Sequence, residues 1–217
     1  MYFEYDNKEI EFLKSHDKLL GEAIDQIGHI YRAVDNDMFS SIVHHIIGQQ
    51  ISTRAQVTIW QRLIDKIGDI NADNIYSLEL NELQKLGMTF KKAEYIKDFA
   101  DKVRNKEFEI NTLNDLSDEE IIKKLSSLKG IGVWTAEMIM IFCLQRPDVV
   151  SFGDLAIHRG MRMLYHHRNI DRKKFEKYKK RYSPYGTVAS LYLWAIAGGA
   201  IPQMRDYAPK KKKEMAK

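Results

Sequence analysis

Cysteine is almost absent from this 217-residue chain, which contains only Cys143. A single thiol cannot form an intramolecular disulfide, a thiolate zinc site or a cysteine-ligated iron–sulfur cluster. No apolar run approaches the roughly 18 residues of a membrane-spanning helix, and the N-terminus MYFEYDNKEIEF lacks a basic segment followed by an apolar core. We therefore expect a soluble, intracellular protein in a reducing compartment.

Proline is rare and confined to the last third of the chain, at positions that suit breaks between helices. No Pro-, Ser- or Gly-rich stretch marks a flexible linker, and alternating runs of strand length are scarce. Apolar residues instead recur at intervals of three and four, as in FSSIVHHIIGQQI and LYLWAIAGGAI. These patterns predict an all-α protein, either one domain or two lobes that pack directly against each other.

Acidic residues are scarce in the C-terminal quarter. Residues 159–217 contain 16 Lys and Arg against 4 Asp and Glu, a formal charge of +12, whereas residues 1–158 contain 18 against 26, or −8. Concentrated positive charge is typical of nucleic-acid binding. A solvated helix face followed by the tail KKKKEMAK also explains it, so the charge alone favours nucleic acid only slightly.

The stretch LKGIGVWTAEMIMIF places Gly130 and Gly132 before an apolar run with helical spacing. A dinucleotide-binding fingerprint would need a preceding strand and a third small residue, where Thr135 stands. The preceding SDEEIIKKLSSL instead predicts a helix whose capping box is formed by Ser117 and Glu120. The segment therefore predicts two helices joined by a glycine-containing turn, a layout that LQKLGMTFKKAEYI partly repeats.

Such a turn can direct several backbone amides at one DNA phosphate, since glycine lets the strand approach closely. An ordinary turn with a glycine C-cap would explain Gly130 but would give Gly132 no role. We therefore favour the phosphate interpretation.

Several segments, taken in order, resemble a known family. The LKGIG turn with VWTA behind it, the segment SFGDLAIHRGMRML, and the stretches FSSIVHHIIGQQIST and LGMTFKKAEYIKDFADKV are similar to the helix-hairpin-helix DNA glycosylase superfamily, in its DNA-3-methyladenine glycosylase II-like branch. The resemblance implies a two-lobed, all-α fold with the active site in the cleft between the lobes. Residues 46–149 would form the middle lobe with the hairpin. Residues 1–45 plus 150–217 would form the lobe with the catalytic aspartate loop and the basic C-terminal region.

The resemblance implies a base-excision-repair enzyme that flips out an alkylated purine such as 3-methyladenine and hydrolyses its N-glycosidic bond. Positive charge then develops on the sugar, and Asp154 would stabilise it and orient the attacking water. An aspartate at a helix start is also an ordinary N-cap, and both roles can hold together. In strand-cleaving relatives a lysine nucleophile stands where this chain has Trp134. Because tryptophan cannot form a Schiff base, we expect a monofunctional enzyme that leaves an abasic site.

The resemblance also implies the remaining site residues. Trp134, Met138 and Trp194 would line the base pocket, since π-faces attract a cationic base; a position in the core explains Trp194 almost as well. His44 and His45 point to different helix faces and predict no metal site. The implied DNA contacts are the hairpin residues Lys129, Gly130, Ile131, Gly132 and Thr135, the wedge residues Gln49, Gln50 (the plug) and Ile51, and the phosphate contacts Arg159 and Arg162.

We expect no required cofactor, metal ion or iron–sulfur cluster, and leave open a monovalent cation at the hairpin. The expected partner is damaged double-stranded DNA, bound by a monomer away from membranes, in the cytoplasm near the nucleoid or in the nucleus. Two alternatives stay open. One is an oxidised-guanine glycosylase, although its strand-cleaving type would carry a lysine at position 134. The other is a non-catalytic helix-hairpin-helix DNA-binding module, against which Asp154 and the aromatic pair argue.

Overall fold

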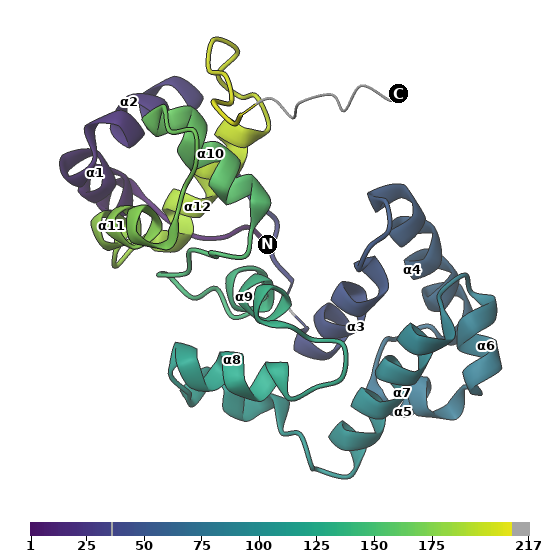
Figure 1. Cartoon of the computed structure of the whole chain (residues 1–217). Coiled ribbons are helices and arrows are strands. Elements are labelled where there is room, and N and C mark those ends of the chain that lie inside the picture. The colour runs from purple at the N-terminus through teal and green to yellow at the C-terminus, as the bar shows by residue number, and fades with distance from the viewer. Residues whose placement is uncertain (36, 210–217) are drawn as a thin grey trace, which may run out of the picture. The chain divides into compact units, whose positions relative to one another are not determined.

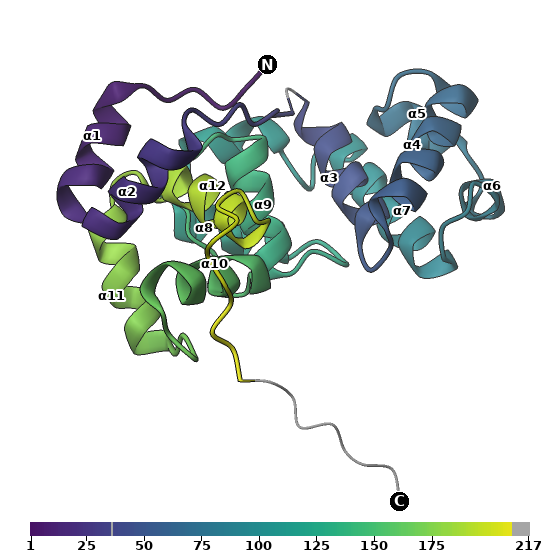
Figure 2. The ribbon, with the colours of Figure 1, turned by 90° about the horizontal axis from the view of Figure 1, so that it is seen from above.

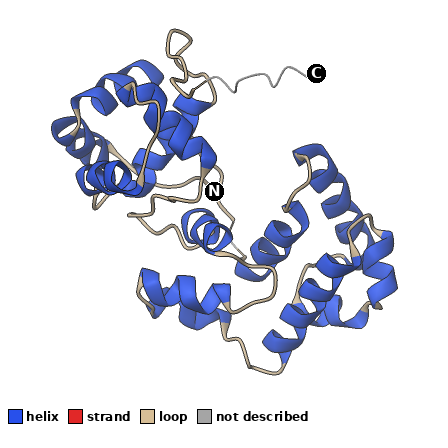
Figure 3. Cartoon of the chain, viewed as in Figure 1, coloured by secondary structure: helices blue, strands red, loops and turns tan. Residues whose placement is uncertain are grey.

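The computed structural model describes residues 1–35 and 37–209, whose regular elements are helices joined by loops (Figure 3). Within these ranges there is no strand, and the β-type pairing is one isolated antiparallel bridge between Tyr2 and Ala33. The all-α prediction is thus confirmed. The basic tail KKKKEMAK, residues 210–217, lies outside the described part, and no helix inside it is long and apolar enough to cross a membrane.

The chain folds as two compact units, each with its own buried apolar residues. The first consists of Val34–Gln145 and Met1, and the second of Tyr2–Ala33 and Arg146–Lys217. The helices of the first unit are α3 (Met38–Gly48), α4 (Thr53–Ile67), α5 (Ala72–Ser77), α6 (Leu80–Lys85), α7 (Phe90–Arg104), the 3-10 helix η1 (Ile110–Asp115), α8 (Asp118–Ser126) and α9 (Val133–Phe142).

Helix α3 explains why the first unit begins at Val34, whereas we expected the middle lobe to begin at residue 46. The helix packs against α4, α7 and α9, and the ring of Phe39 stacks on that of Phe99 in α7 with their centres 4.9 Å apart. Helical periodicity identified α3 as amphipathic, but not the core that its apolar face joins. The unit ends at Gln145 rather than at residue 149.

The second unit is built around α12 (Gly186–Ala197), which Figures 1 and 2 show among the unit's other helices. It contacts each of them and is apolar nearly all round, as expected of a buried helix. Helix α10 packs tightly on it because Gly160 has no side chain: a Cβ there would collide with the Leu193 carbonyl oxygen. The other helices are α1 (Asn7–His16), α2 (Lys18–Ile27), α10 (Leu155–Tyr165) and α11 (Arg172–Tyr182).

Helix starts and breaks follow the local signals in the sequence. Ser117 and Glu120 form the predicted capping box of α8, since the Ser117 N–H donates to Glu120 Oε2 at 2.9 Å and the Glu120 N–H donates to Ser117 Oγ at 3.4 Å. Residues 83–96 form the predicted helix, glycine turn and helix, with Gly87 between α6 and α7. The prolines fall between helices or after the last one, as predicted.

A buried carboxylate ties three helices of the second unit together. Asp17 is 3% exposed and accepts hydrogen bonds from the Leu20 N–H at 3.0 Å, the Tyr165 hydroxyl at 2.8 Å and Arg181 Nη1 at 3.0 Å. Burial raises the pKa of Tyr165 well above its ordinary value, so its hydroxyl remains a donor. Because a buried charge is costly without such partners, the cluster holds α2 to α10 and α11.

Asp17→Asn should lower the free energy of unfolding by about 2–3 kcal/mol, because the amide removes the charge that Tyr165 and Arg181 bind. Urea unfolding followed by circular dichroism measures the change. Asp171→Asn is the matched control, since Asp171 caps α11 at the surface, accepting from the Lys174 N–H at 2.8 Å, and asparagine caps equally well. Equal stability of the two variants would contradict this account of Asp17.

Candidate functional site

The two hairpin glycines differ in what the fold requires of them. Gly130 has a φ of +82°, and a Cβ there would collide with the Tyr95 ring of α7, so the fold itself demands glycine. Gly132 is the N-cap of α9 with an ordinary φ of −95°, and an added Cβ would meet no described atom within 4 Å. The fold gives no reason for glycine at this second position. The prediction that a phosphate approaches it therefore supplies a role that packing does not.

The other hairpin residues divide between surface and core. The side chain of Lys129 is 63% exposed, and its Nζ lies 2.6 Å from Asp98 Oδ1, which raises the pKa of Lys129. Ile131 and Thr135 are buried, at 5% and 6% exposed. Their side chains belong to the core, so the contacts we expect from them with DNA would use the backbone.

The wedge loop lies beside the hairpin in the first unit. Gln49 Nε2 donates to the Gly130 carbonyl oxygen at 2.6 Å, so this side chain ties the loop to the hairpin. Gln50 is exposed with a φ of +55°, and Ile51 is 36% exposed. Gln49 thus anchors the loop to the hairpin, whereas Gln50 is exposed. Gln50 remains the residue we expect to act as the plug.

Asp154 in the second unit is a buried N-cap, as its sequence context predicted. The residue is 7% exposed, and its Oδ1 accepts from the Ala156 N–H at 2.8 Å and the Ile157 N–H at 2.9 Å. These bonds fix the carboxylate at the start of α10, where the helix dipole favours a negative charge.

The sequence did not reveal what holds the loop before Asp154. The Nε2 of His158, one turn into α10, lies 2.8 Å from the Phe152 carbonyl oxygen. The Phe152 ring packs edge-on against Phe175 with their centres 5.0 Å apart, and the Arg172 guanidinium lies 4.6 Å from its centre. A histidine one turn after the aspartate was the only local signal of this support.

The predicted base-pocket residues differ in exposure. Trp134, in the first turn of α9, is 44% exposed, whereas Met138, one turn later, is 4% exposed. Trp194 of α12 is partly exposed in a helix that is otherwise almost entirely buried. Trp194 is therefore not a fully buried core residue.

Arg162, also predicted as a phosphate contact, forms an ion pair within the second unit. Its Nε and Nη2 pair with Asp206 Oδ1 and Oδ2 at 2.7 Å and 2.6 Å, and the side chain is 19% exposed. The planar guanidinium thus already forms a bidentate ion pair with Asp206. This partner lies 44 positions further along the chain, so no local sequence pattern could reveal it. Arg159 is exposed and remains a predicted phosphate contact.

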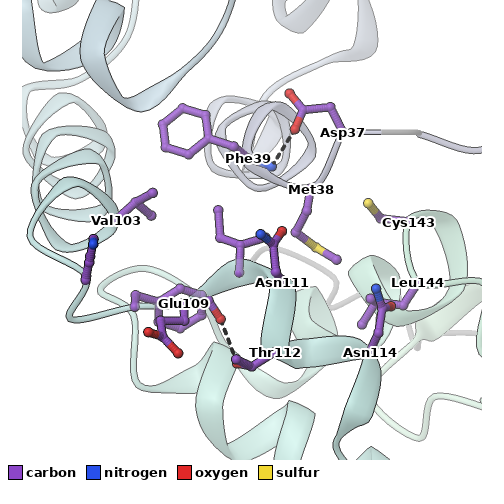
Figure 4. Close-up of a pocket in the computed structure, with 13 residues that line it drawn as sticks. Asp37, Met38, Phe39, Val103, Glu109, Asn111, Thr112, Asn114, Cys143 and Leu144 are labelled. Atoms are coloured by element: carbon purple, nitrogen blue, oxygen red, sulfur yellow. Dashed lines mark hydrogen bonds between the residues drawn. The ribbon is translucent and has the colours of Figure 1, made fainter.

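A pocket of about 670 Å³ lies in the first unit beside the start of α3 (Figure 4), and none of the predicted site residues lines it. Burial raises the pKa of the Cys143 thiol in its wall to about 11, which keeps it protonated and a poor nucleophile. The pocket is lined by Asp37, Met38, Phe39, Val103, Lys106, Phe108, Glu109, Ile110, Asn111, Thr112, Asn114, Cys143 and Leu144.

The two neighbouring histidines of α3 have structural surroundings. The His44 ring packs edge-on against Trp60 of α4 with their centres 4.8 Å apart. Burial, with a smaller effect of His44, lowers the pKa of His45 to about 4, so that ring is neutral near pH 7. Among the residues the structure describes, no three His, Cys, Asp or Glu side chains are grouped to hold a metal ion.

Comparison with known proteins identifies relatives that align with most of this chain. The crystal structure of DNA-3-methyladenine glycosidase from Bacillus halodurans matches with a TM-score of 0.85 and 33% identity, covering 95% of this chain and 97% of that chain. DNA-3-methyladenine glycosylase 1 of Schizosaccharomyces pombe is 30% identical over 165 residues, which are 72% of this chain and 71% of that protein. YfjP of Bacillus subtilis is 27% identical over 74% of this chain, which spans only 59% of that relative's length.

A more distant solved structure shares the fold. The 8-oxoguanine glycosylase/lyase of Clostridium acetobutylicum has a TM-score of 0.74 at 22% identity, with 89% of this chain and 72% of that chain covered, so this likeness concerns the fold alone. Residues 43–184, which include both the hairpin and Asp154, match the family described as HhH-GPD superfamily base excision DNA repair protein. The chain is therefore a member of the HhH-GPD superfamily of base excision DNA repair proteins.

Proposed function

We propose that this chain is a monofunctional DNA glycosylase that hydrolyses the N-glycosidic bond of alkylated purines such as 3-methyladenine in double-stranded DNA. The observation that carries the proposal is the buried Asp154 carboxylate, fixed by two backbone amides at the start of α10. The relatives named DNA-3-methyladenine glycosylase support the substrate class. We further propose that the protein acts as a monomer and needs no cofactor.

In this proposal Asp154 acts on the sugar. As the bond from C1′ to the base nitrogen breaks, the electron pair leaves with the base and positive charge develops on the sugar ring. A fixed carboxylate stabilises that charge without reorganising, and it can accept a proton from the water that attacks C1′. The products are the free base and an intact strand with an abasic site.

Trp134 supports two parts of the proposal, the alkylated-purine substrate and a product strand that is left intact. A purine alkylated at N3 or N7 is cationic, and an indole face attracts a cation by about 0.5–2 kcal/mol. Because position 134 holds no amine, the chain offers no Schiff-base nucleophile there. Trp194 and Met138 are the further pocket residues of the proposal, with Trp194 favoured by its partial exposure.

The hairpin and the wedge loop would hold the DNA. The amides at the start of α9 would bind a phosphate in front of Gly132, where an added Cβ meets open space. Gln50 would fill the gap that the flipped nucleotide leaves. A monovalent cation at the hairpin is compatible with this proposal but is not required by it.

Base release with three product analyses tests the proposal. Duplex DNA treated with a methylating agent is incubated with the protein, and the released bases are identified by chromatography. We expect methylated purines in solution, strands that break only after alkali, and no covalent complex after borohydride reduction. Strand breaks without alkali, or a borohydride-trapped complex, would contradict the monofunctional assignment. Release of 8-oxoguanine instead of methylated purines would favour the oxidised-guanine alternative.

Arg159→Gln should reduce the salt dependence of DNA binding. Each phosphate neutralised contributes about −0.9 to the slope of log affinity against log salt, so loss of an exposed contact should flatten the slope by about that amount. Fluorescence anisotropy of a labelled duplex over a salt series measures it. Arg162→Gln is the comparison variant, and its slope should change less because the Arg162 guanidinium is already bound to Asp206. A larger change for Arg162→Gln than for Arg159→Gln would place the DNA path differently.

A further inference from the structure

The loop after α3 presents Gln50 in a conformation that must be held by its surroundings. Its φ of +55° brings Cβ close to backbone oxygen, which makes this region uncommon for residues other than glycine. The Gln50 side chain is exposed, so its packing does not stabilise this backbone conformation. A residue keeps such a backbone only where neighbouring structure determines it.

Lys92, in the first turn of α7, supplies two of the bonds that hold this loop. Its Nζ donates to the carbonyl oxygen of Ile47 at 2.7 Å and to that of Gln49 at 2.6 Å. These carbonyls lie at the C-terminal end of α3, where helices leave acceptors unpaired and a cation is favoured. Burial lowers the pKa of Lys92, as expected for an ammonium withdrawn from water into such a contact.

A second bond joins the same loop to the hairpin. Gln49 Nε2 donates to the Gly130 carbonyl oxygen, and Gly130 lies against the Tyr95 ring of α7. The loop, the start of α7 and the hairpin thereby surround a pocket of about 340 Å³ within the first unit. Its lining residues are Gln49, Gln50, Ile51, Thr89, Lys91, Lys92, Tyr95 and Gly130.

We propose that Lys92 is a positioning residue for base flipping, whose ammonium fixes the carbonyls of Ile47 and Gln49 so that Gln50 is presented ready to fill the duplex. This inference rests on the proposed function and deepens it. A plug that is already ordered loses less conformational freedom when it enters DNA, which favours the flipped state. Lys92 acts through the loop and touches neither the base nor the sugar.

Three variants isolate this role. Lys92→Met keeps most of the aliphatic stem but removes the ammonium, whereas Lys92→Arg restores a cationic donor. Lys97→Met is the matched control, because Lys97 of the same helix also donates to two backbone carbonyls, those of Tyr76 at 2.6 Å and Leu78 at 2.7 Å, but does not line this pocket. Circular dichroism and the melting temperature establish that each variant is folded.

The substrates separate flipping from chemistry. One duplex carries a single 7-methylguanine opposite cytosine, and the other carries it opposite thymine, where the weaker pairing lowers the energy of extrusion. Single-turnover base release by Lys92→Met should be about tenfold slower on the paired duplex and within about threefold of wild type on the mismatched one. Lys97→Met should match wild type on both, and Lys92→Arg should recover most of the rate. Equal losses of Lys92→Met on both duplexes, or no loss on the paired one, would overturn the inference.

A binding measurement distinguishes failure of this inference from failure of the proposed function. A duplex with a tetrahydrofuran abasic analogue opposite 2-aminopurine reports insertion of the plug by fluorescence, with no base to release. Wild type and Lys97→Met should change the signal at saturation, and Lys92→Met should change it much less. If wild type releases no methylated purine from methylated duplex DNA and no base from either 7-methylguanine duplex, the proposed function fails, and the fluorescence signal alone tests the role of Lys92. Equal signals from all three proteins would overturn the inference.

Discussion

Asp154→Asn should slow single-turnover base release from alkylated duplex DNA by about 100-fold or more, while the protein stays folded and still binds the lesion. The amide oxygen can accept the same two backbone bonds from Ala156 and Ile157, so the cap persists. The negative charge is lost, and with it the stabilisation of the sugar cation. Base release under enzyme excess measures the first effect, and anisotropy with labelled lesion DNA measures the second.

Asp171→Asn is again the matched control, since it makes the same substitution at the surface N-cap of α11 in the same unit. It should release base at the wild-type rate. Near-normal release by Asp154→Asn would mean that another carboxylate stabilises the sugar, and Glu137 of α9 would be the next to test. Loss of folding in Asp154→Asn would instead show that the charge serves the structure.

Gly132→Asp should weaken DNA binding by about 10- to 100-fold without loss of helicity. A carboxylate about 4 Å from a phosphate is repelled by roughly 1 kcal/mol in water and roughly 4 kcal/mol near a protein surface. The fold should tolerate the side chain, because the φ of Gly132 is ordinary and an added Cβ meets open space. Anisotropy and circular dichroism measure the two properties.

Gly132→Ala separates charge from bulk at the same position. It adds a Cβ into the same open space without a charge, so its affinity should stay within a few-fold of wild type. Wild-type affinity of Gly132→Asp would show that the turn joins two helices and does not approach a phosphate.

The features that sequence predicted correctly depend on neighbouring residues. Apolar residues at intervals of three to four predicted the helices. The spacing of Ser117 and Glu120 predicted the start of α8, and the position of Asp154 before an apolar helical run predicted an N-cap. Each of these signals acts over a few positions. The hairpin was also predictable from local signals, because its two glycines lie between two segments with helical periodicity.

The features that sequence missed depend on partners far along the chain. Arg162 was predicted as a phosphate contact, and its ion pair with Asp206, 44 positions away, was not foreseen. Position 130 requires glycine because a Cβ there would collide with the Tyr95 ring. The loop that carries Gln50 is fixed by the hydrogen bond from Lys92 to the Gln49 carbonyl oxygen. Such pairings follow from how helices pack, which helical periodicity does not specify.

The most direct test of the proposed function is chromatographic identification of the bases that wild type and Asp154→Asn release from methylated duplex DNA under identical conditions. Wild type should release free methylated purines, Asp154→Asn should release them at least about 100-fold more slowly, and the strands should stay intact until alkali is added. No methylated purine released by the wild-type protein, or equal release by the two proteins, would contradict the proposed function.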